Sequence, residues 1–598
     1  MRYPKLRALE TSRQMVDTFK GYNHNLRIGD GEFFDMKNMT SDYYPVLSPR
    51  KKRGVYASPT SLSGLITKDA LCYVDGQYFV INQYPIDMGL NDEPKQLISM
   101  GAYVIILPDK KWINTGCWVN GEFDTEKGCG NIDAEFTTTS TVSFTLCKLD
   151  GSDYSIGDIP SLEPGKPENM ELWIDTSTEP HSLKQWSESA GMWVTIATTY
   201  VKISSPGIDA AFEKYDGIEI SGLSGTLTDS VSNNIIEDTS DLAALEGAAV
   251  VWEKGDGYIV VVGILDTVKT IKEQITISRK MPEMDFVVES GNRLFGCRYG
   301  EANNGEVVNE IYASKLGDFK NWSCYMGLST DSYTASCGTD GMFTGAITHL
   351  GYPLFFKENC VHKVYGNYPA NFQIQDTACA GVQRGCEKSL AIVNTTLFYK
   401  SRSGVCAYDG SLPTEISYAL GNEAYSEAVG GAHGNKYYIS MKDNSNAYNL
   451  FVYDVAKGMW HKEDDIKVEQ FCSCDGEMYA ISDGKIITML GSGTQDAEDV
   501  TWMVETGEIG ISSPDMKYIS RLTVRMSMDI GAEVGIYVQY DFSDEWECQC
   551  VLRSTNLRSF SIPIRPKRCD HMKLRIEGVG AVKIYSILKT IEQGSELS

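Results

Sequence analysis

The segment Lys436-Tyr-Tyr-Ile-Ser440 is followed by Asn449-Leu-Phe-Val-Tyr453, and then by Asp454 and Trp460. Both runs are short, apolar and rich in Tyr and β-branched residues, which is typical of β-strands joined by a turn. Related pairs of runs recur at residues 71–112, 293–322, 353–365, 397–408 and 478–489. One such antiparallel sheet cannot bury both faces alone, whereas several sheets stacked around an axis can. The recurrence therefore predicts a β-propeller.

The composition also favours an all-β chain. The 598 residues include 33 Tyr, 55 Gly and only 19 Pro. Tyr suits pleated, half-buried surfaces and Gly supplies turns with positive φ, so a helical bundle or a doubly wound fold is disfavoured. At about 40–50 residues per blade, residues 276–498 hold about five blades and residues 55–116 hold the first. We predict six or seven blades; the alternative is a pair of β-sandwiches with loosely similar strands.

Two further zones flank or interrupt the predicted propeller. Residues 117–275 contain a Thr-rich run at 136–144 and a Trp-containing meander at 172–196, which predict one or two small β-domains inserted in a blade loop. Residues 499–598 contain runs such as Gly535-Ile-Tyr-Val-Gln-Tyr540, in which apolar and polar side chains alternate. This alternation predicts a C-terminal β-sandwich.

Charge and hydropathy exclude several classes of protein. The chain has 54 Lys and Arg against 80 Asp and Glu, a net charge of −26, so a general electrostatic footprint for nucleic acid is not expected. No stretch approaches 18 consecutive apolar residues, and Met1-Arg-Tyr-Pro-Lys-Leu-Arg7 is not followed by an apolar run. We therefore expect neither a membrane span nor a signal peptide, and a chain that folds in a reducing cytoplasm.

Motifs for catalysis and metal binding are missing from the sequence. There is no Gly-x-Ser-x-Gly, no Walker-type loop and no His-Glu-x-x-His, and the seven His are scattered. Gly29-Asp-Gly-Glu32 and Asp443-Asn-Ser-Asn446 lack the spacing of a calcium loop and are predicted to be turns. The Cys472/Cys474 and Cys548/Cys550 pairs lack further zinc ligands, so we predict free thiols. We expect no enzyme, no cofactor and no metal.

Residues 1–54 are predicted to be a docking arm. They carry 11 Lys and Arg against 6 Asp and Glu, and they end in a basic run. The residues expected to dock are Phe33, Phe34, Met36, Met39, Tyr43, Tyr44, Arg50, Lys51, Lys52 and Arg53. The arm is expected to become ordered by lying across the propeller or by reaching the acidic surface of an adjacent copy; the alternative is a solvated tail. If the arm docks, deleting residues 1–54 leaves a folded propeller that no longer assembles, and replacing both Tyr with Ala weakens assembly more than neutralising the basic run.

The inserted zone carries the residues that are expected to stack on a ligand. Trp173, Trp186 and Trp193 are spaced across the predicted meander. Indole rings on blades are most often core residues, but exposed rings can stack on the apolar faces of sugars. These three Trp are therefore candidates for carbohydrate binding.

Three stretches resemble structural proteins of tailed bacteriophages. They are Phe19-Lys-Gly-Tyr-Asn23 with residues 31–54, then residues 520–587, and finally the insert around Leu172-Trp-Ile-Asp-Thr-Ser177. Together they cover about 150 residues of the chain. The resemblance implies a virion protein with a β-propeller, such as a tail hub, nozzle or tail-tip adaptor. It also implies partners, namely further copies of this chain in a ring and neighbouring tail or neck proteins.

Two functions follow from these expectations. The first is a structural component of a phage tail, made in the host cytoplasm and placed around the DNA channel, whose negative lumen lets genome DNA slide past without specific binding. The second is a carbohydrate- or receptor-binding β-propeller at the virion surface, with a host glycan as partner. A cell-wall glycosidase built on a propeller is a weaker third possibility.

Overall fold

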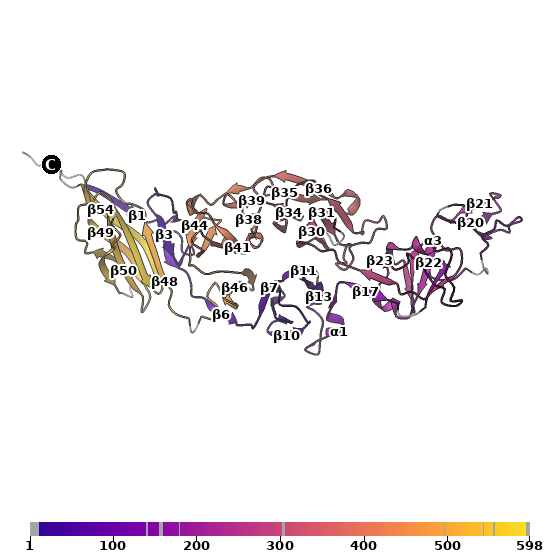
Figure 1. Ribbon diagram of the computed structural model, residues 1–598. Coiled ribbons are helices and arrows are strands. Elements are labelled where there is room, and N and C mark those ends of the chain that lie inside the picture. Colours follow the sequence, from indigo (N-terminus) through magenta and orange to yellow (C-terminus); the bar gives the residue numbers. More distant parts are fainter. Residues whose placement is uncertain are drawn as a thin grey trace, which may run out of the picture.

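The computed structural model describes residues 11–138, 141–154, 159–178, 180–301, 305–494, 497–541, 543–553 and 557–593. Almost all regular structure in these residues is β-strand. The molecule is elongated, with a β-sandwich at one end, a ring of small sheets in the middle and an inserted domain at the other end (Figure 1). The predicted all-β class, with a propeller, an inserted β-domain and a C-terminal β-sandwich, is confirmed.

Seven four-stranded antiparallel sheets form the propeller, within the predicted range of six or seven. The first three are β7 (Leu62–Lys68), β8 (Ala70–Asp75), β9 (Tyr78–Ile81) and β10 (Tyr84–Asp87); β11 (Gln96–Met100), β12 (Tyr103–Leu107), β13 (Lys111–Asn114) and β16 (Cys129–Asn131); and β29 (Phe286–Ser290), β30 (Arg293–Glu301), β31 (Val307–Ala313) and β32 (Tyr333–Ser336). The next two are β33 (Gly345–His349), β34 (Tyr352–Lys357), β35 (Cys360–Tyr365) and β36 (Gln373–Ala378); and β37 (Ala391–Val393), β38 (Thr396–Lys400), β39 (Val405–Tyr408) and β40 (Thr414–Glu415). The last two are β41 (Ser426–His433), β42 (Lys436–Lys442), β43 (Tyr448–Asp454) and β44 (Met459–Lys462); and β45 (Gln470–Cys474), β46 (Glu477–Ser482), β47 (Lys485–Thr488) and β6 (Gly54–Ala57).

The ring is closed by a strand from the beginning of the chain. β6 pairs with β47, with Val55 opposite Ile487, and so completes the seventh blade just before the first blade starts. The first strand of the first blade, β7, contacts β11 of the second blade and β45 of the seventh. Because one sheet then contains both an early and a late segment, the ring cannot open without breaking that sheet.

The apolar runs that recur in the sequence are the second and third strands of the blades. In the sixth blade these are β42 and β43, which pair along Lys436–Lys442 and whose central residues are buried. Asp454 then accepts a hydrogen bond from the backbone N–H of Lys457 in the following turn (3.1 Å), and Trp460 packs on Tyr453 (4.9 Å between ring centroids). The strands of the sequence pattern are therefore buried on both faces because neighbouring blades cover them.

The β-sandwich is built from both ends of the chain. One sheet has the order β1 (Thr11–Val16), β54 (Val582–Gln593), β49 (Lys517–Met528) and β52 (Arg558–Ile562). The other has the order β2 (Gly21–Tyr22), β3 (Glu32–Lys37), β48 (Thr501–Thr506), β53 (Met572–Val579), β50 (Glu533–Tyr540) and β51 (Glu547–Leu552). Residues 11–54 are thus not a separate docking arm, because they supply three strands of this sandwich as well as β6. The short strands β4 (Met39–Thr40) and β5 (Ser48–Pro49) pair between them.

The inserted domain begins later than the sequence suggested. The helix α1 (Thr125–Gly128) and the hairpin of β14 (Trp118–Val119) and β15 (Glu122–Phe123) lie between β13 and β16, and so belong to the second blade. The insert proper runs from β17 (Ala134–Thr137) to β28 (Thr276–Arg279), which pair with each other, with Ala134 opposite Arg279. Its entry and exit strands therefore lie side by side.

Two sheets enclose the core of the insert. The first has the order β17, β28, β23 (Gly217–Ser221) and β24 (Gly247–Val250). The second has the order β25 (Glu253–Gly255), β26 (Tyr258–Val262), β22 (Tyr200–Ser204), β18 (Val142–Cys147) and β27 (Lys269–Ile271). Short helices lie at α2 (Ile208–Ala211) and α3 (Ser240–Ala243), and 3-10 turns in the propeller at η1 (Pro369–Asn371), η2 (Glu387–Ser389) and η3 (Tyr418–Leu420). A third, three-stranded sheet projects beyond this core at the far end of the molecule (Figure 1).

Candidate functional site: an aromatic face at the end of the insert

The third sheet of the insert carries all three predicted ligand-stacking residues on one face. Its strands are β19 (Leu172–Asp175), β20 (Ser182–Ser187) and β21 (Met192–Thr195), with β20 in the centre. Side chains alternate between the two faces of a strand, so Trp173, Trp186 and Trp193 share a face. The opposite face packs on the insert through a small core that includes Leu172, Ile174 and Leu183. The three Trp therefore lie on the side that faces away from this core; we call it the aromatic face.

The indole rings of the aromatic face touch in a chain. Trp186 and Trp193 are directly opposite in the register of β20 and β21, and their ring centroids are 5.4 Å apart with an interplanar angle of 70°. Trp173 lies 5.4 Å from Trp193 with an angle of 59°. All three side chains are half-buried. The rings thus shield each other in part and keep part of their apolar surface in contact with water.

Two charged residues share the face with the indoles. Lys184 lies opposite Trp173 in the register, and its ammonium group is 4.9 Å from the centroid of that ring. Lys184 Nζ also donates a hydrogen bond to Asp175 Oδ2 (2.6 Å), and the Ser177 hydroxyl donates to Asp175 Oδ1 (2.5 Å). These hydrogen bonds, first of all the one from Lys184, lower the pKa of Asp175 to about 2. Asp175 is therefore a carboxylate at neutral pH.

The aromatic face is tied to the body of the insert by buried polar contacts. His181, which precedes β20, places its Nδ1 at 3.1 Å from Asp241 Oδ1. The Asp241 carboxylate also accepts the backbone N–H of Asp266 (3.0 Å) and lies 3.9 Å from the ammonium group of Lys269. Burial raises the pKa of Asp241. The contacts of Asp241 fix the start of β20 relative to the insert core.

Buried polar contacts also hold the root of the insert, by which we mean the place where it joins the propeller. The carboxylate of Asp216 forms an ion pair with Arg279, and both side chains are buried. Asn321 of the third blade donates a hydrogen bond from its side-chain Nδ2 to Asp216 Oδ1 (2.8 Å). Its side-chain Oδ1 accepts the backbone N–H of Gly217 (2.8 Å). The insert is therefore joined to the propeller by a buried polar junction.

Three of the ten predicted docking residues are core residues of the sandwich. Phe33, Met36 and Met39 have exposed fractions of 2% or less and belong to the core that the sandwich shares with the propeller. Phe34 is half-buried against His24, with ring centroids 4.2 Å apart. These side chains are unavailable for an adjacent copy because they are already packed within this one.

Tyr43 and Tyr44 are the predicted aromatic docking residues that are exposed, at 47% and 40%. Each lies beneath a lysine: the ammonium group of Lys583 is 4.0 Å from the Tyr43 ring centroid, and that of Lys457 is 5.7 Å from the Tyr44 ring centroid. They lie in the short turn between β4 and β5. Nothing in this arrangement tests their role in assembly.

The basic run at residues 50–53 divides into buried and exposed members. Arg53 contacts Glu463 (2.6 Å) and Asp464 (2.7 Å), which follow the last strand of the sixth blade, and Arg50 contacts Asp464 (3.1 Å). Lys52 pairs with Asp499 at 2.7 Å, and Lys51 is exposed. The two arginines therefore hold the chain segment between the sandwich and the propeller onto a blade. Their ion pairs are not the salt-screened surface contacts that the sequence suggested.

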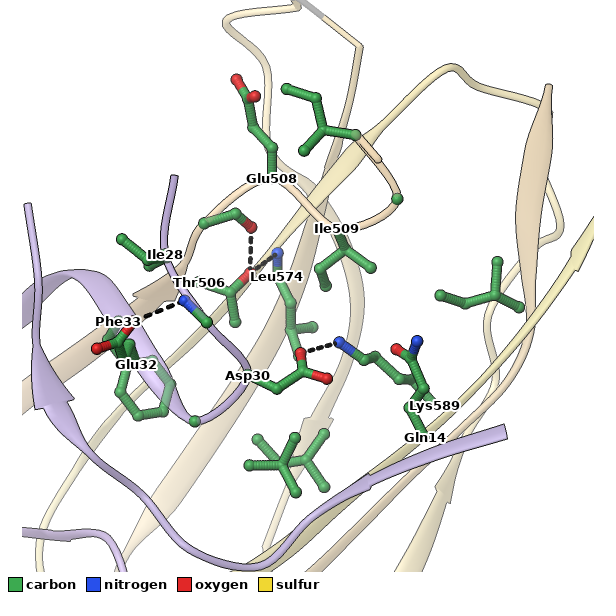
Figure 2. A pocket seen from close by; sticks show the side chains of 18 of the residues that line it. Gln14, Ile28, Asp30, Glu32, Phe33, Thr506, Glu508, Ile509, Leu574 and Lys589 are labelled. Carbon is green, nitrogen blue, oxygen red and sulfur yellow. Dashed lines mark hydrogen bonds and ion pairs between the residues drawn. The ribbon is translucent and has the colours of Figure 1, made fainter. Parts of the chain in front are cut away.

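A pocket of about 310 Å³ opens in the sandwich next to the segment Gly29-Asp-Gly-Glu32 (Figure 2). Its walls combine apolar residues such as Phe33 and Leu574 with polar ones such as Gln14 and Thr506. Asp30 Oδ1 lies 2.6 Å from Lys589 Nζ across the pocket, and Glu32 turns back to accept the backbone N–H of Gly29 (2.6 Å). The carboxylates of this turn thus serve the protein's own contacts. Asp443 likewise accepts the backbone N–H of Ser445 in a turn (2.8 Å).

Side chains that could hold a metal ion are not gathered in the described ranges. In those ranges, no three or more His, Cys, Asp or Glu side chains come together to hold a metal ion. The 16 cysteines are free thiols; nine are buried, whereas Cys548 is exposed. No helix within the described part of the chain is long and apolar enough to cross a membrane.

Sequence reasoning found the three indoles of the aromatic face but missed their polar neighbours Asp175 and Lys184. The signal was present, because Trp173 and Asp175 are two residues apart, as are Lys184 and Trp186. A period of two places both charges on the same face as the indoles. The short connection between β19 and β20 then brings the two charges together.

No protein-family model and no curated protein matches the chain. Among solved structures, an exo-beta-1,3-galactanase from Phanerochaete chrysosporium is similar at 9% identity, covering 51% of this chain and 94% of that one, with a TM-score of 0.20. An arabinoxylan arabinofuranohydrolase from Bacillus subtilis is similar at 7% identity (52% and 95% covered, TM-score 0.18). An acylaminoacyl peptidase from Pyrococcus horikoshii is similar at 9% identity (54% and 55% covered, TM-score 0.24).

These matches correct one expectation. The sequence led us to expect a chain without enzymatic activity, but glycoside hydrolases are among the solved structures that match half of it. The expectation of no enzyme is therefore withdrawn. At TM-scores of 0.18–0.24 the likeness carries no argument for a particular reaction, substrate or catalytic residue.

Proposed function

We propose that the protein binds carbohydrate, and that the aromatic face of Trp173, Trp186 and Trp193 is its binding surface. The observation that carries this proposal is the gathering of three mutually contacting indoles on the side of a small sheet that faces away from its core. A core role would place them on the opposite face, beside Leu172 and Leu183. Indoles that stay partly in water gain free energy when an apolar surface covers them.

The chemistry of the surrounding side chains suits a sugar. A pyranose offers an apolar face of C–H groups, which can cover an indole, and a rim of hydroxyl groups that both donate and accept hydrogen bonds. Lys184 supplies N–H donors next to Trp173, whereas Asp175 is buried and its carboxylate is engaged by Lys184 and Ser177. A ligand that stacks on the rings can therefore place a hydroxyl group beside Lys184.

The position of the aromatic face also supports binding of an external ligand. It lies at one end of an elongated molecule, and the sandwich that contains both chain ends lies at the other (Figure 1). Assembly into a phage-tail ring stays a prediction from the sequence. The segment that was expected to mediate it supplies strands to its own sandwich.

The test compares the full-length protein with single Trp variants on a glycan array and by titration calorimetry. We expect Trp186→Ala and Trp193→Ala to weaken glycan binding by roughly 30-fold, because truncating a central aromatic anchor typically costs about 2 kcal/mol. Trp118→Ala is the matched control. Trp118 is also partly exposed and packs on Tyr84, but it belongs to a hairpin of the second blade.

Two results would contradict the proposal. One is an array on which the full-length protein binds no glycan. The other is unchanged affinity in both Trp186→Ala and Trp193→Ala, with circular dichroism showing that each variant is folded. Equal losses in these variants and in Trp118→Ala would place the ligand elsewhere, and would also count against the aromatic face.

A further inference from the structure

We infer that the aromatic face is built for a single, uncharged glycan chain, and that it discriminates against acidic glycans and against flat crystalline polysaccharide surfaces. This inference rests on the proposed function, since it names the class of carbohydrate that the face takes. Three independent features of the insert carry it: its net charge, the tilt of the indoles and the pairing of Lys184.

The insert accounts for more than half of the net negative charge of the protein. Residues 134–279 contain 23 Asp and Glu against 9 Lys and Arg, a net charge of −14, whereas the whole chain carries −26. These residues are only 146 of the 598. A concentrated field of one sign repels ligands of the same sign over about 10 Å at moderate salt. A polyanionic glycan therefore meets repulsion before it reaches the indoles.

The charges next to the aromatic face have the same sign. Residues 159–199, which include the three-stranded sheet, contain six Asp and Glu against two Lys. Glu168 and Glu188 are exposed, and Glu171 precedes Trp173 by two residues on the same face. Glu171 also lies opposite Trp186, because the backbone N–H of Trp186 donates to the Glu171 carbonyl (2.9 Å). An acidic sugar stacked on Trp186 would thus lie beside a carboxylate.

The lysine of the face cannot offset this repulsion, because its ammonium group is engaged. Lys184 Nζ is held by Asp175 at 2.6 Å, so the pair presents no net charge to a ligand. Asp175 is buried, so Lys184 is the member of the pair that a ligand can reach; a hydroxyl group accepts from Lys184 without bringing a charge, whereas a sugar carboxylate or sulfate brings a negative charge next to Asp175. The Asp175–Lys184 pair therefore matches the rim of a neutral sugar better than that of an acidic one.

The tilt of the indoles excludes a flat ligand surface. The rings of Trp186 and Trp173 are inclined to that of Trp193 by 70° and 59°. Because the Trp193 ring is inclined to both others, a crystal face cannot lie flat on all three rings at once. A single chain can turn about its glycosidic bonds, and can thus follow successive rings that face different directions.

The test uses the full-length protein on an array that carries matched pairs of glycans. Sialylated glycans are printed beside their desialylated forms, and hyaluronan oligomers beside their carboxyl-reduced forms. We expect the uncharged member of a recognised pair to bind at least tenfold more tightly at 150 mM NaCl, and this ratio to shrink at 500 mM NaCl because salt screens the repulsion. Microcrystalline cellulose and chitin should not deplete the protein from solution.

A charge-neutralised variant separates the electrostatic effect from the shape of the face. Glu168→Gln together with Glu188→Gln, both exposed residues near the sheet, should raise the affinity for the acidic members severalfold and leave the affinity for the neutral members unchanged. Glu283→Gln with Glu306→Gln, outside the insert, is the control with the same change in net charge, and should change neither affinity.

The outcomes separate the failure of this inference from that of the proposed function. An empty array contradicts carbohydrate binding itself, and the inference falls with it. Acidic glycans that bind as tightly as, or more tightly than, their neutral partners overturn the inference and leave carbohydrate binding intact. If crystalline cellulose or chitin removes the protein from solution while no soluble oligomer binds, the inference is also overturned and carbohydrate binding stays intact, because the ligand is then a flat surface.

Discussion

Arg53 tests how the sandwich and the propeller are held together. It lies between β5 of the sandwich region and β6, the strand that closes the ring. Its guanidinium group contacts both Glu463 and Asp464, and its side chain is only 10% exposed. Arg53→Met keeps much of the side-chain length and volume but removes the charge and both contacts. Glu463 is then left with Arg50, whose Nε lies 3.8 Å away.

The expected loss of stability follows from the burial of this cluster. Removing one partner of a buried ion pair typically destabilises a protein by about 3–5 kcal/mol, whereas an exposed pair contributes about 0–1 kcal/mol. Because Arg50 still compensates Glu463 and Asp464 in part, we expect about 3 kcal/mol. Burial already raises the pKa of Glu463, and loss of Arg53 should raise it further. The destabilisation should therefore be smaller at pH 5, where Glu463 can take up a proton.

Urea denaturation followed by tryptophan fluorescence measures this loss. Trp460 and Trp502 report on it, because both belong to the core that the sandwich and the propeller share. Lys51→Met is the matched control, since Lys51 is exposed and two residues away; it should change the free energy of unfolding by about 0.5 kcal/mol or less. Adding Glu463→Gln to Arg53→Met should recover part of the loss. A loss below about 1 kcal/mol for Arg53→Met would refute the reasoning.

Two further predictions concern buried groups. His461 is buried and neither ring nitrogen has a hydrogen-bond partner among the described residues, and burial lowers its pKa well below the ordinary value of 6.5. The imidazole therefore stays neutral in the folded state, whereas it takes up a proton in the unfolded state below pH 6.5. The free energy of unfolding should then fall by about 1.4 kcal/mol per pH unit below pH 6.5. Urea denaturation at several pH values should show a smaller slope in His461→Phe. Asp216→Ala should destabilise the root of the insert by about 3–5 kcal/mol, because it leaves Arg279 buried without its carboxylate. Limited proteolysis between blade and insert should accelerate in Asp216→Ala but not in Glu219→Ala, whose side chain is exposed on β23 three residues after Asp216.

The propeller could be predicted because the strands that define it are close in sequence. The second and third strands of a blade are joined by short turns and covered on both faces by other blades, so they read as paired apolar runs. The first strands are less apolar, since one side lines the centre of the ring; β33, for example, has three half-buried residues between two buried ends. The recurring apolar runs therefore predicted the positions of the blades, but they did not show that the runs are the second and third strands of each blade.

The docking arm was predicted wrongly because its partners lie more than 450 residues away. Phe33 and Met36 look like anchors without a core when only residues 1–54 are considered. Their core is formed by β48 and β53, and Met36 pairs with Val504 in the register of β3 and β48. A local pattern shows that a segment must bury apolar side chains, but it does not show against which strand.

The same long-range pairing has a mechanical consequence for the aromatic face. The chain begins in the sandwich, passes the Arg50–Arg53 segment, closes the ring through β6 and returns to the sandwich after the seventh blade. Any force on the insert is therefore transmitted through its paired strands β17 and β28 and through the contacts of Asp216 with Arg279 and Asn321. These lead into the propeller ring, which is closed by the pairing of β6 with β47. A ligand bound by the three indoles is thus connected through packed, hydrogen-bonded structure to the opposite end of the molecule.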